Sequence, residues 1–240
     1  MKRSPFLGTM APLEVPFTAM TRRALLAGSI VSLGGVLGCT PHQEPTQSTT
    51  FTGSDPEYVM ILVLDLSGSY AQYIENGRAW AAVETIVRQF FRDRAGENDK
   101  IIIAQISSQP QGPIWSGSKR AFRQELGSES AFRNLLKKYN GSSRVFDSIR
   151  ESVEYALPMM GKGRAGCFIF SDMDDNSSAP GGEDRLVQAF AEFGQKGGAV
   201  GIYWCGFYEM EKWRVHLKRT VKNHVISANI DTDPQLPVWD

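Results

Sequence analysis

The sequence has few of the residues on which many catalytic sites depend. It contains three cysteines and three histidines in 240 residues, too few cysteines for a disulfide framework. His42 lies in a polar segment, whereas His216 and His224 lie in a predicted late helix and near the last predicted strand. A serine nucleophile needs a base beside it, and no histidine is clearly placed for that role. Glycine-rich phosphate loops are absent as well. Nucleophilic catalysis is therefore not expected.

An excess of basic residues is also absent. The 26 basic and 26 acidic residues give a formal net charge of zero. The first 38 residues carry +3, so residues 39–240 carry −3. Nucleic-acid binding usually relies on a basic stripe that neutralises phosphates. We therefore expect no nucleic-acid partner.

The N-terminal segment has an apolar stretch that is too short to span a bilayer. Ala24 to Gly38 is uncharged over 15 residues, whereas a span of ~30 Å needs about 20. It has the proportions of a signal peptide, and Arg22-Arg23 before it resembles a twin-arginine export signal. Val36-Leu37-Gly38-Cys39 resembles a bacterial lipobox, which implies cleavage before Cys39 and lipidation of its sulfur. An uncleaved anchor and a chance apolar run are the alternatives.

These features predict three regions. Residues 1–38 are the expected export signal, 39–56 a flexible tether and 57–240 a single folded domain. Thr40 to Ser54 is rich in Pro, Gln, Ser and Thr, and such a segment cannot bury enough apolar surface to fold. We expect a lipoprotein of the bacterial cell envelope, anchored to a membrane through Cys39 and facing the periplasm or the exterior. The sequence leaves open whether Met1 or Met20 is the start.

The rest of the chain alternates between predicted strands and helices. Residues 58–64 form a continuous apolar run, typical of a strand buried on both faces. Similar runs occupy 100–106, 167–170, 199–205 and 224–230, and apolar residues recur at helical spacing in 79–91, 131–136, 145–156 and 186–193. Ile114-Trp115 is a candidate antiparallel edge strand. This order predicts an α/β fold: a Rossmann-like, mostly parallel sheet with helices on both faces. Cys167 and Cys205 are then expected at opposite strand ends, as buried thiols rather than a disulfide.

Three loops carry the candidate site. Asp65-Leu66-Ser67-Gly68-Ser69 follows the first strand, residues 140–143 precede a helix, and residues 171–176 follow the 167–170 strand. Ligands of such sheets bind at the carboxyl ends of the strands. The two strand-end loops offer carboxylates and hydroxyls without a nearby Lys, Arg or His. An oxygen-rich crevice of this kind favours a hard divalent cation, and Mg²⁺ suits it.

The same three loops resemble those of von Willebrand factor type A (vWA) domains. Residues 65–69 match the Asp-x-Ser-x-Ser motif, residues 141–149 resemble the Gly-Gly-Thr loop with its helix, and Phe170-Ser171-Asp172 resembles the Thr-Asp-Gly segment. The resemblance covers about residues 57–230. It implies a metal-ion-dependent adhesion site that binds Mg²⁺, or Mn²⁺ or Ca²⁺, and takes an acidic residue from a partner. The implied metal-site residues are Asp65, Ser67, Ser69, Ser143 and Asp172.

The chain departs from the family pattern at two positions. Ser143 replaces the usual threonine and Met173 the usual glycine, so the backbone at Met173 is expected to differ. Helix capping by the site hydroxyls and by Asp172 is the alternative to metal binding. Asp174 and Asp175 are interpreted as solvated loop acids or partner contacts. Asp147 is interpreted as the acceptor of a structural hydrogen bond within its helix.

The predicted function follows from these features. We expect a non-enzymatic, lipid-tethered vWA domain that binds a protein partner through the metal site. A metal-independent assembly subunit of an envelope complex is one alternative. A metal-dependent phosphatase is another, although Ser67 stands where the haloacid-dehalogenase-like phosphatases have a second acid.

Overall fold

The chain divides into two units, Met1–Thr49 and Thr50–Asp240. The computed structural model describes residues 56, 58–66, 76–93, 96, 98–110, 112–136, 143–161, 164–177, 180–228 and 235–237, all in the second unit. The predicted export signal, the tether and Cys39 lie outside the described residues. Ser67 and Ser69 lie outside them too. Within the described part, no helix is long and apolar enough to cross a membrane.

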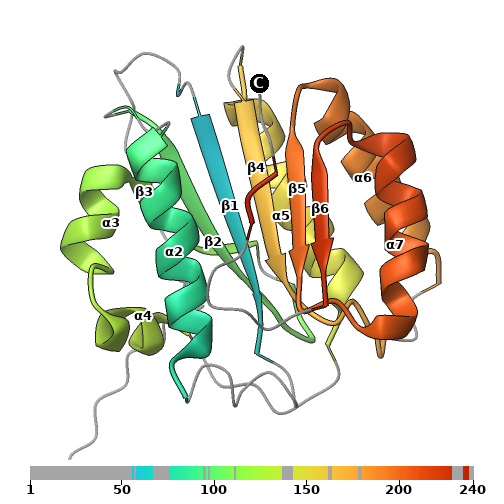
Figure 1. Ribbon diagram of the computed structural model, residues 1–240, viewed down its shortest axis with the longest axis horizontal. Helices are drawn as coiled ribbons and strands as arrows, with labels where there is room; N and C mark the ends of the chain where they lie inside the picture. The colour runs from blue at the N-terminus through green and yellow to red at the C-terminus, as the bar shows by residue number, and fades with distance from the viewer. Residues whose placement is uncertain are drawn as a thin grey trace, which may run out of the picture. The chain divides into compact units, whose positions relative to one another are not determined.

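The described part of the second unit contains a six-stranded sheet with helices on both faces (Figure 1). The strands are β1 (Tyr58–Asp65), β2 (Lys100–Ile106), β3 (Pro113–Ser118), β4 (Arg164–Phe170), β5 (Ala199–Tyr203) and β6 (His224–Ser227). The helices are α2 (Arg78–Asp93), α3 (Lys119–Glu125), α4 (Glu129–Leu135), α5 (Val145–Ala156), η2 (Leu157–Met159), α6 (Gly182–Gln195) and α7 (Phe207–Thr220). The strand order is β3-β2-β1-β4-β5-β6, and only the β2–β3 pair is antiparallel. The predicted α/β fold class is confirmed.

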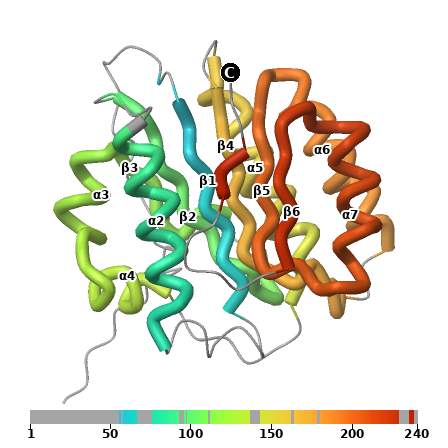
Figure 2. Tube along the Cα trace, in the orientation of Figure 1, coloured from blue at the N-terminus to red at the C-terminus, as the bar shows by residue number. Residues whose placement is uncertain are grey.

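The first strand shows why the sheet is covered on both faces. Successive side chains of a strand point to opposite faces. Val59, Ile61 and Val63 belong to a core cluster with residues of α5, α6 and α7, whereas the alternate residues Met60 and Leu62 pack with α2, α3 and α4. Figure 2 shows β1 between these two groups of helices. A continuous apolar run is what such a doubly buried strand requires.

The bounds of β1, β2 and α5 agree with the sequence prediction to within one residue. β4 begins three residues earlier than predicted, because Arg164 pairs with Tyr58 of β1. β5 ends at Tyr203 rather than at position 205, and Trp204, at a φ of 66°, turns the chain out of the strand. α3 was not predicted at all, and its N-cap residue is Ser118, whose hydroxyl accepts from the Ala121 N–H at 3.3 Å.

The two cysteines in the described domain are buried and unbonded, as predicted. Burial raises the pKa of the Cys205 thiol to about 12, and the nearby carboxylates of Glu209 and Asp172 also raise it. Burial likewise raises the pKa of Cys167. A thiolate, not a thiol, is the reactive form, so neither side chain is an activated nucleophile.

Candidate functional site

The adjacent strands β1 and β4 bring Asp65 beside Ser171. Leu64 pairs with Phe170 in the sheet, so the residues that follow them, Asp65 and Ser171, lie at the same edge of the sheet. Asp65 is 3% exposed and Ser171 is fully buried. The Ser171 hydroxyl donates to Oδ2 of Asp65 at 2.9 Å and accepts from the Met173 N–H at 3.1 Å. Ser171 therefore orients the Asp65 carboxylate and the loop after β4 together.

The residues just before α5 reach the same edge of the sheet by a contact with the residue that follows β2. Asp65 pairs with Ile106 at the end of β2, and the Arg144 N–H donates to the carbonyl of the following residue, Ser107, at 3.1 Å. Ser143 precedes Arg144 and is buried. The Val145 N–H donates to Oδ1 of Asp175 at 3.3 Å, which ties the start of α5 to the loop after β4. Three segments distant in sequence therefore meet where β1, β2 and β4 end.

Helix capping does not account for Ser143 or Asp172. The N-cap residue of α5 is Arg144, without a side-chain cap, and that of α6 is Gly181. Asp175 is half-buried and accepts from the first turn of α5, a contact that the interpretation of Asp175 as a solvated loop acid or partner contact did not include. Asp174 is exposed, as expected for a solvated loop acid.

Met173 adopts the conformation that glycine favours. Its φ is 63°, in the left-handed region, and its side chain is fully buried in the core beneath α5 and α6. Left-handed backbone is uncommon for residues other than glycine. Met173 therefore has the left-handed backbone that a glycine at this position would favour, rather than ordinary right-handed or extended backbone. Burial of the side chain offsets the conformational cost.

Negative charge accumulates around Asp172. Burial raises the pKa of its carboxyl group. The Asp174 N–H donates to Asp172 Oδ1 at 3.0 Å and opposes that effect, whereas the charges of Asp65 and Asp174 raise the pKa further. Like charges held close to Asp172 disfavour the ionised form of its carboxyl group. A cation bound between these carboxylates would remove the repulsion.

A second buried carboxylate belongs to the scaffold of the site. Asp147 is 1% exposed and accepts from Arg144 Nε at 3.0 Å and from Arg185 Nη2, on α6, at 3.3 Å. Burial alone would raise the pKa of Asp147, but the two arginines outweigh it and hold the pKa below its ordinary value. The predicted structural hydrogen bond is confirmed, and it extends to a second helix. It fixes the first turn of α5 beside Ser143.

An exposed aromatic pair adjoins Asp172. The Gly206 N–H donates to the Asp172 carbonyl at 2.9 Å, and α7 begins at the next residue. Phe207 and Tyr208 are 77% and 93% exposed, and their ring centroids lie 5.9 Å apart. Sequence reasoning missed this pair, because two adjacent aromatics give no periodic signal. Trp213, on the same helix, is fully buried in the core.

The predicted metal residues are thus only partly described. Asp65, Ser143 and Asp172 lie on segments that converge at one edge of the sheet, whereas Ser67 and Ser69 are outside the described residues. Within the described ranges, no group of three or more His, Cys, Asp and Glu side chains is arranged to hold a metal ion. His216 hydrogen-bonds to the Glu183 carboxylate and His224 to the Val221 carbonyl, and neither makes a hydrogen bond to a serine among the described residues.

Several solved structures resemble this chain. Proximal thread matrix protein 1 from the mussel byssus aligns over 75% of this chain and 46% of its own, with a TM-score of 0.50 and 13% identity. The pilus adhesin SpaC from Lactobacillus rhamnosus GG aligns over 75% and 28%, with a TM-score of 0.49 and 12% identity. A von Willebrand factor type A protein from Catenulispora acidiphila aligns over 70% and 43%, with a TM-score of 0.38 and 13% identity.

The likeness is one of fold. At 13% identity, the mussel protein shares the α/β architecture with this chain and shows nothing of its activity. The chain spans less than half the length of each of these three proteins. No protein-family profile and no curated protein sequence matches it.

Proposed function

We propose that this chain is a lipid-tethered, extracytoplasmic vWA-type domain that binds a protein partner through a divalent metal ion. The proposed metal residues are Asp65, Ser67, Ser69, Ser143 and Asp172. One observation carries the proposal: buried Asp65, buried Ser143 and the Asp172 loop converge at the carboxyl edge of the sheet. That edge is where open α/β sheets bind ligands.

The donor set fits a hard cation. Its members are carboxylate and hydroxyl oxygens, which Mg²⁺, Mn²⁺ and Ca²⁺ prefer. Ser143 is buried and caps no helix, so metal coordination gives its hydroxyl a role. Ser171 holds Asp65 in place by a hydrogen bond of 2.9 Å. When bound, the metal supplies a Lewis-acidic position for a carboxylate of the partner.

Two features favour binding over catalysis. Neither His216 nor His224 makes a hydrogen bond to a serine in the part of the chain that the structure describes, so the nucleophile–base pair of a serine hydrolase is not seen there. Phe207 and Tyr208, beside Asp172, offer a large exposed aromatic surface. Aromatic side chains of this kind often dominate the energy of protein interfaces. A partner carboxylate at the metal and apolar partner groups on this pair would together give affinity and orientation.

The membrane tether is proposed from the N-terminal motifs. Lipidation of Cys39 and an export signal over residues 1–38 would deliver the domain to the bacterial envelope. Growth with a labelled fatty acid tests this directly. The wild-type chain should carry the label and Cys39→Ala should not. Equal labelling of both chains would contradict the tether.

Partner capture in two buffers tests the function. The full-length chain, immobilised, should retain an envelope protein in Mg²⁺ and release it in EDTA. Asp172→Asn should lose the partner, and Asp184→Asn, an exposed acid on α6, should keep it. Retention unchanged in EDTA would overturn metal-dependent binding and favour the assembly-subunit alternative. Metal-dependent hydrolysis of p-nitrophenyl phosphate, lost in Asp65→Ala, would favour the phosphatase instead.

A further inference from the structure

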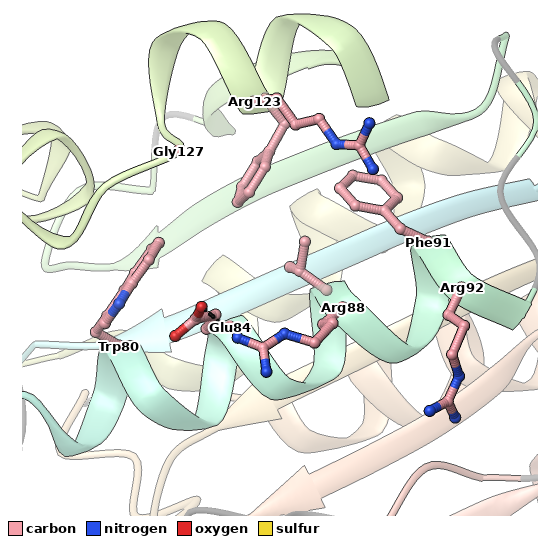
Figure 3. Close-up of a pocket in the computed structure, with 9 residues that line it drawn as sticks. Trp80, Glu84, Arg88, Phe91, Arg92, Arg123 and Gly127 are labelled. Atoms are coloured by element: carbon pink, nitrogen blue, oxygen red, sulfur yellow. Dashed lines mark hydrogen bonds and ion pairs between the residues drawn. The ribbon is translucent and has the colours of Figure 1, made fainter.

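A pocket of about 400 Å³ lies between α2 and α3, on the face of the sheet opposite α5 (Figure 3). We call it the α2–α3 pocket, and it shares no residue with the proposed metal site. Its α2 residues fall at positions 80, 84, 87, 88, 91 and 92. Spacings of three and four place such residues on one stripe of a helix. The pocket is therefore a continuous feature along α2.

The floor of the pocket is apolar and firmly packed. Val87 and Phe122 are 4% and 5% exposed. The rings of Phe91 and Phe122 meet edge to face, with centroids 5.9 Å apart. Trp80, at one end of the pocket in Figure 3, packs against Phe132 of α4, with centroids 5.2 Å apart. These supports keep the aromatic walls in place, so the cavity is preformed for an apolar group.

The rim of the pocket is basic. Three arginines and a single acid, Glu84, contribute side chains to its lining. Arg88 pairs with Glu84 at 2.6 Å, and both side chains are exposed. The Arg123 guanidinium lies over the Phe91 ring, 5.6 Å from its centroid, as Figure 3 shows. One carboxylate and three guanidinium groups give the residues that line this apolar cavity a formal charge of +2.

We propose that the α2–α3 pocket binds an acidic peptide segment of a partner protein, with an aromatic or aliphatic side chain as its anchor. The anchor enters the cavity between Trp80 and Phe91, and flanking carboxylates contact Arg88 and Arg123. Guanidinium groups suit carboxylates because they donate two parallel hydrogen bonds. The volume lies within the range of roughly 300–1,000 Å³ typical of ligand pockets. A concave site of this kind favours an inserted side chain over a flat membrane surface.

Photo-crosslinking to the full-length chain tests the location and the chemistry. The probe is the peptide acetyl-Glu-Asp-Phe-Glu-Asp-Leu-amide, with benzoylphenylalanine in place of Phe. Mass spectrometry should place the crosslinks within residues 80–92 and 122–127. Excess unmodified peptide should compete, and a Gln/Asn version of the same peptide should not. Crosslinks elsewhere, or equal competition by the neutral peptide, would overturn the proposal.

Arginine variants give the second readout. Arg88→Gln and Arg123→Gln should each lower crosslinking by about fivefold, the upper range for an exposed ion pair. Arg214→Gln is the matched control, because Arg214 is an exposed helix arginine paired with Glu211 on α7. Equal yields from all the variants would contradict the assigned contacts. Binding of phosphatidylglycerol vesicles that depends on Arg88 and Arg123, without peptide crosslinking, would replace the peptide by a membrane surface.

Discussion

Replacing Ser171 by alanine should strongly destabilise the fold. The wild-type hydroxyl makes two buried hydrogen bonds, to Asp65 Oδ2 at 2.9 Å and from the Met173 N–H at 3.1 Å. A hydrogen bond to a charged group contributes about 1.5–3 kcal/mol, and a buried donor left without an acceptor costs about 1–3 kcal/mol. Partial relaxation of the loop reduces the sum. We expect Ser171→Ala to lower the free energy of unfolding by about 3 kcal/mol.

Urea denaturation of the full-length chain in EDTA measures this loss without a metal contribution. Ser152→Ala is the matched control, because Ser152 is also fully buried and its hydroxyl donates to the Ser148 carbonyl at 2.7 Å, inside α5. That carbonyl keeps its helical hydrogen bond, so the control should lose about 1 kcal/mol or less. Equal losses in the two variants would refute the role assigned to Ser171.

Two further substitutions test the scaffold of the site. Asp147→Asn should cost about 3 kcal/mol at neutral pH, the usual cost of breaking a buried ion pair. Because the folded-state pKa of Asp147 is lowered, its stabilisation is full above the unfolded pKa of about 3.9 and disappears as the pH falls through the folded value. Urea titrations from pH 7 to pH 2 should therefore show the two chains converging, and a constant gap would contradict this. At position 173, Met173→Gly should be less destabilising than Met173→Ala, since both lose the buried side chain but only glycine relieves the φ of 63°. The reverse order in thermal unfolding would contradict the left-handed backbone.

Local patterns were enough to predict most of the fold. β2 spans Lys100–Ile106, the same residues as the predicted strand. Burial on both faces requires a continuous apolar run, and Gln105 is the one polar residue inside it. α5 carries apolar residues through its full length, and its predicted span agrees with the structure. α3 escaped prediction because it is only seven residues long and buries a single residue, Phe122. One buried position gives no helical period to recognise.

The supporting contacts of the site depend on tertiary register. Ser171 meets Asp65 only because β1 and β4 pair with Leu64 opposite Phe170, which a sequence pattern does not specify. Asp175 meets Val145 across 30 positions of sequence. The family motif pointed to Asp65, Ser143 and Asp172, but not to the residues that hold them in place. The roles of Ser67, Ser69 and Cys39 stay predictions from their motifs.

Direct titration with Mn²⁺ tests the central proposal most sharply. Electron paramagnetic resonance of free Mn²⁺ should show saturable binding to the full-length chain, because an all-oxygen site suits this ion. Ser143→Ala and Asp172→Asn should weaken or abolish that binding, whereas the exposed control Asp184→Asn should bind as the wild type does. Absence of binding to the wild-type chain, or equal binding by all four chains, would contradict a metal site at this edge of the sheet.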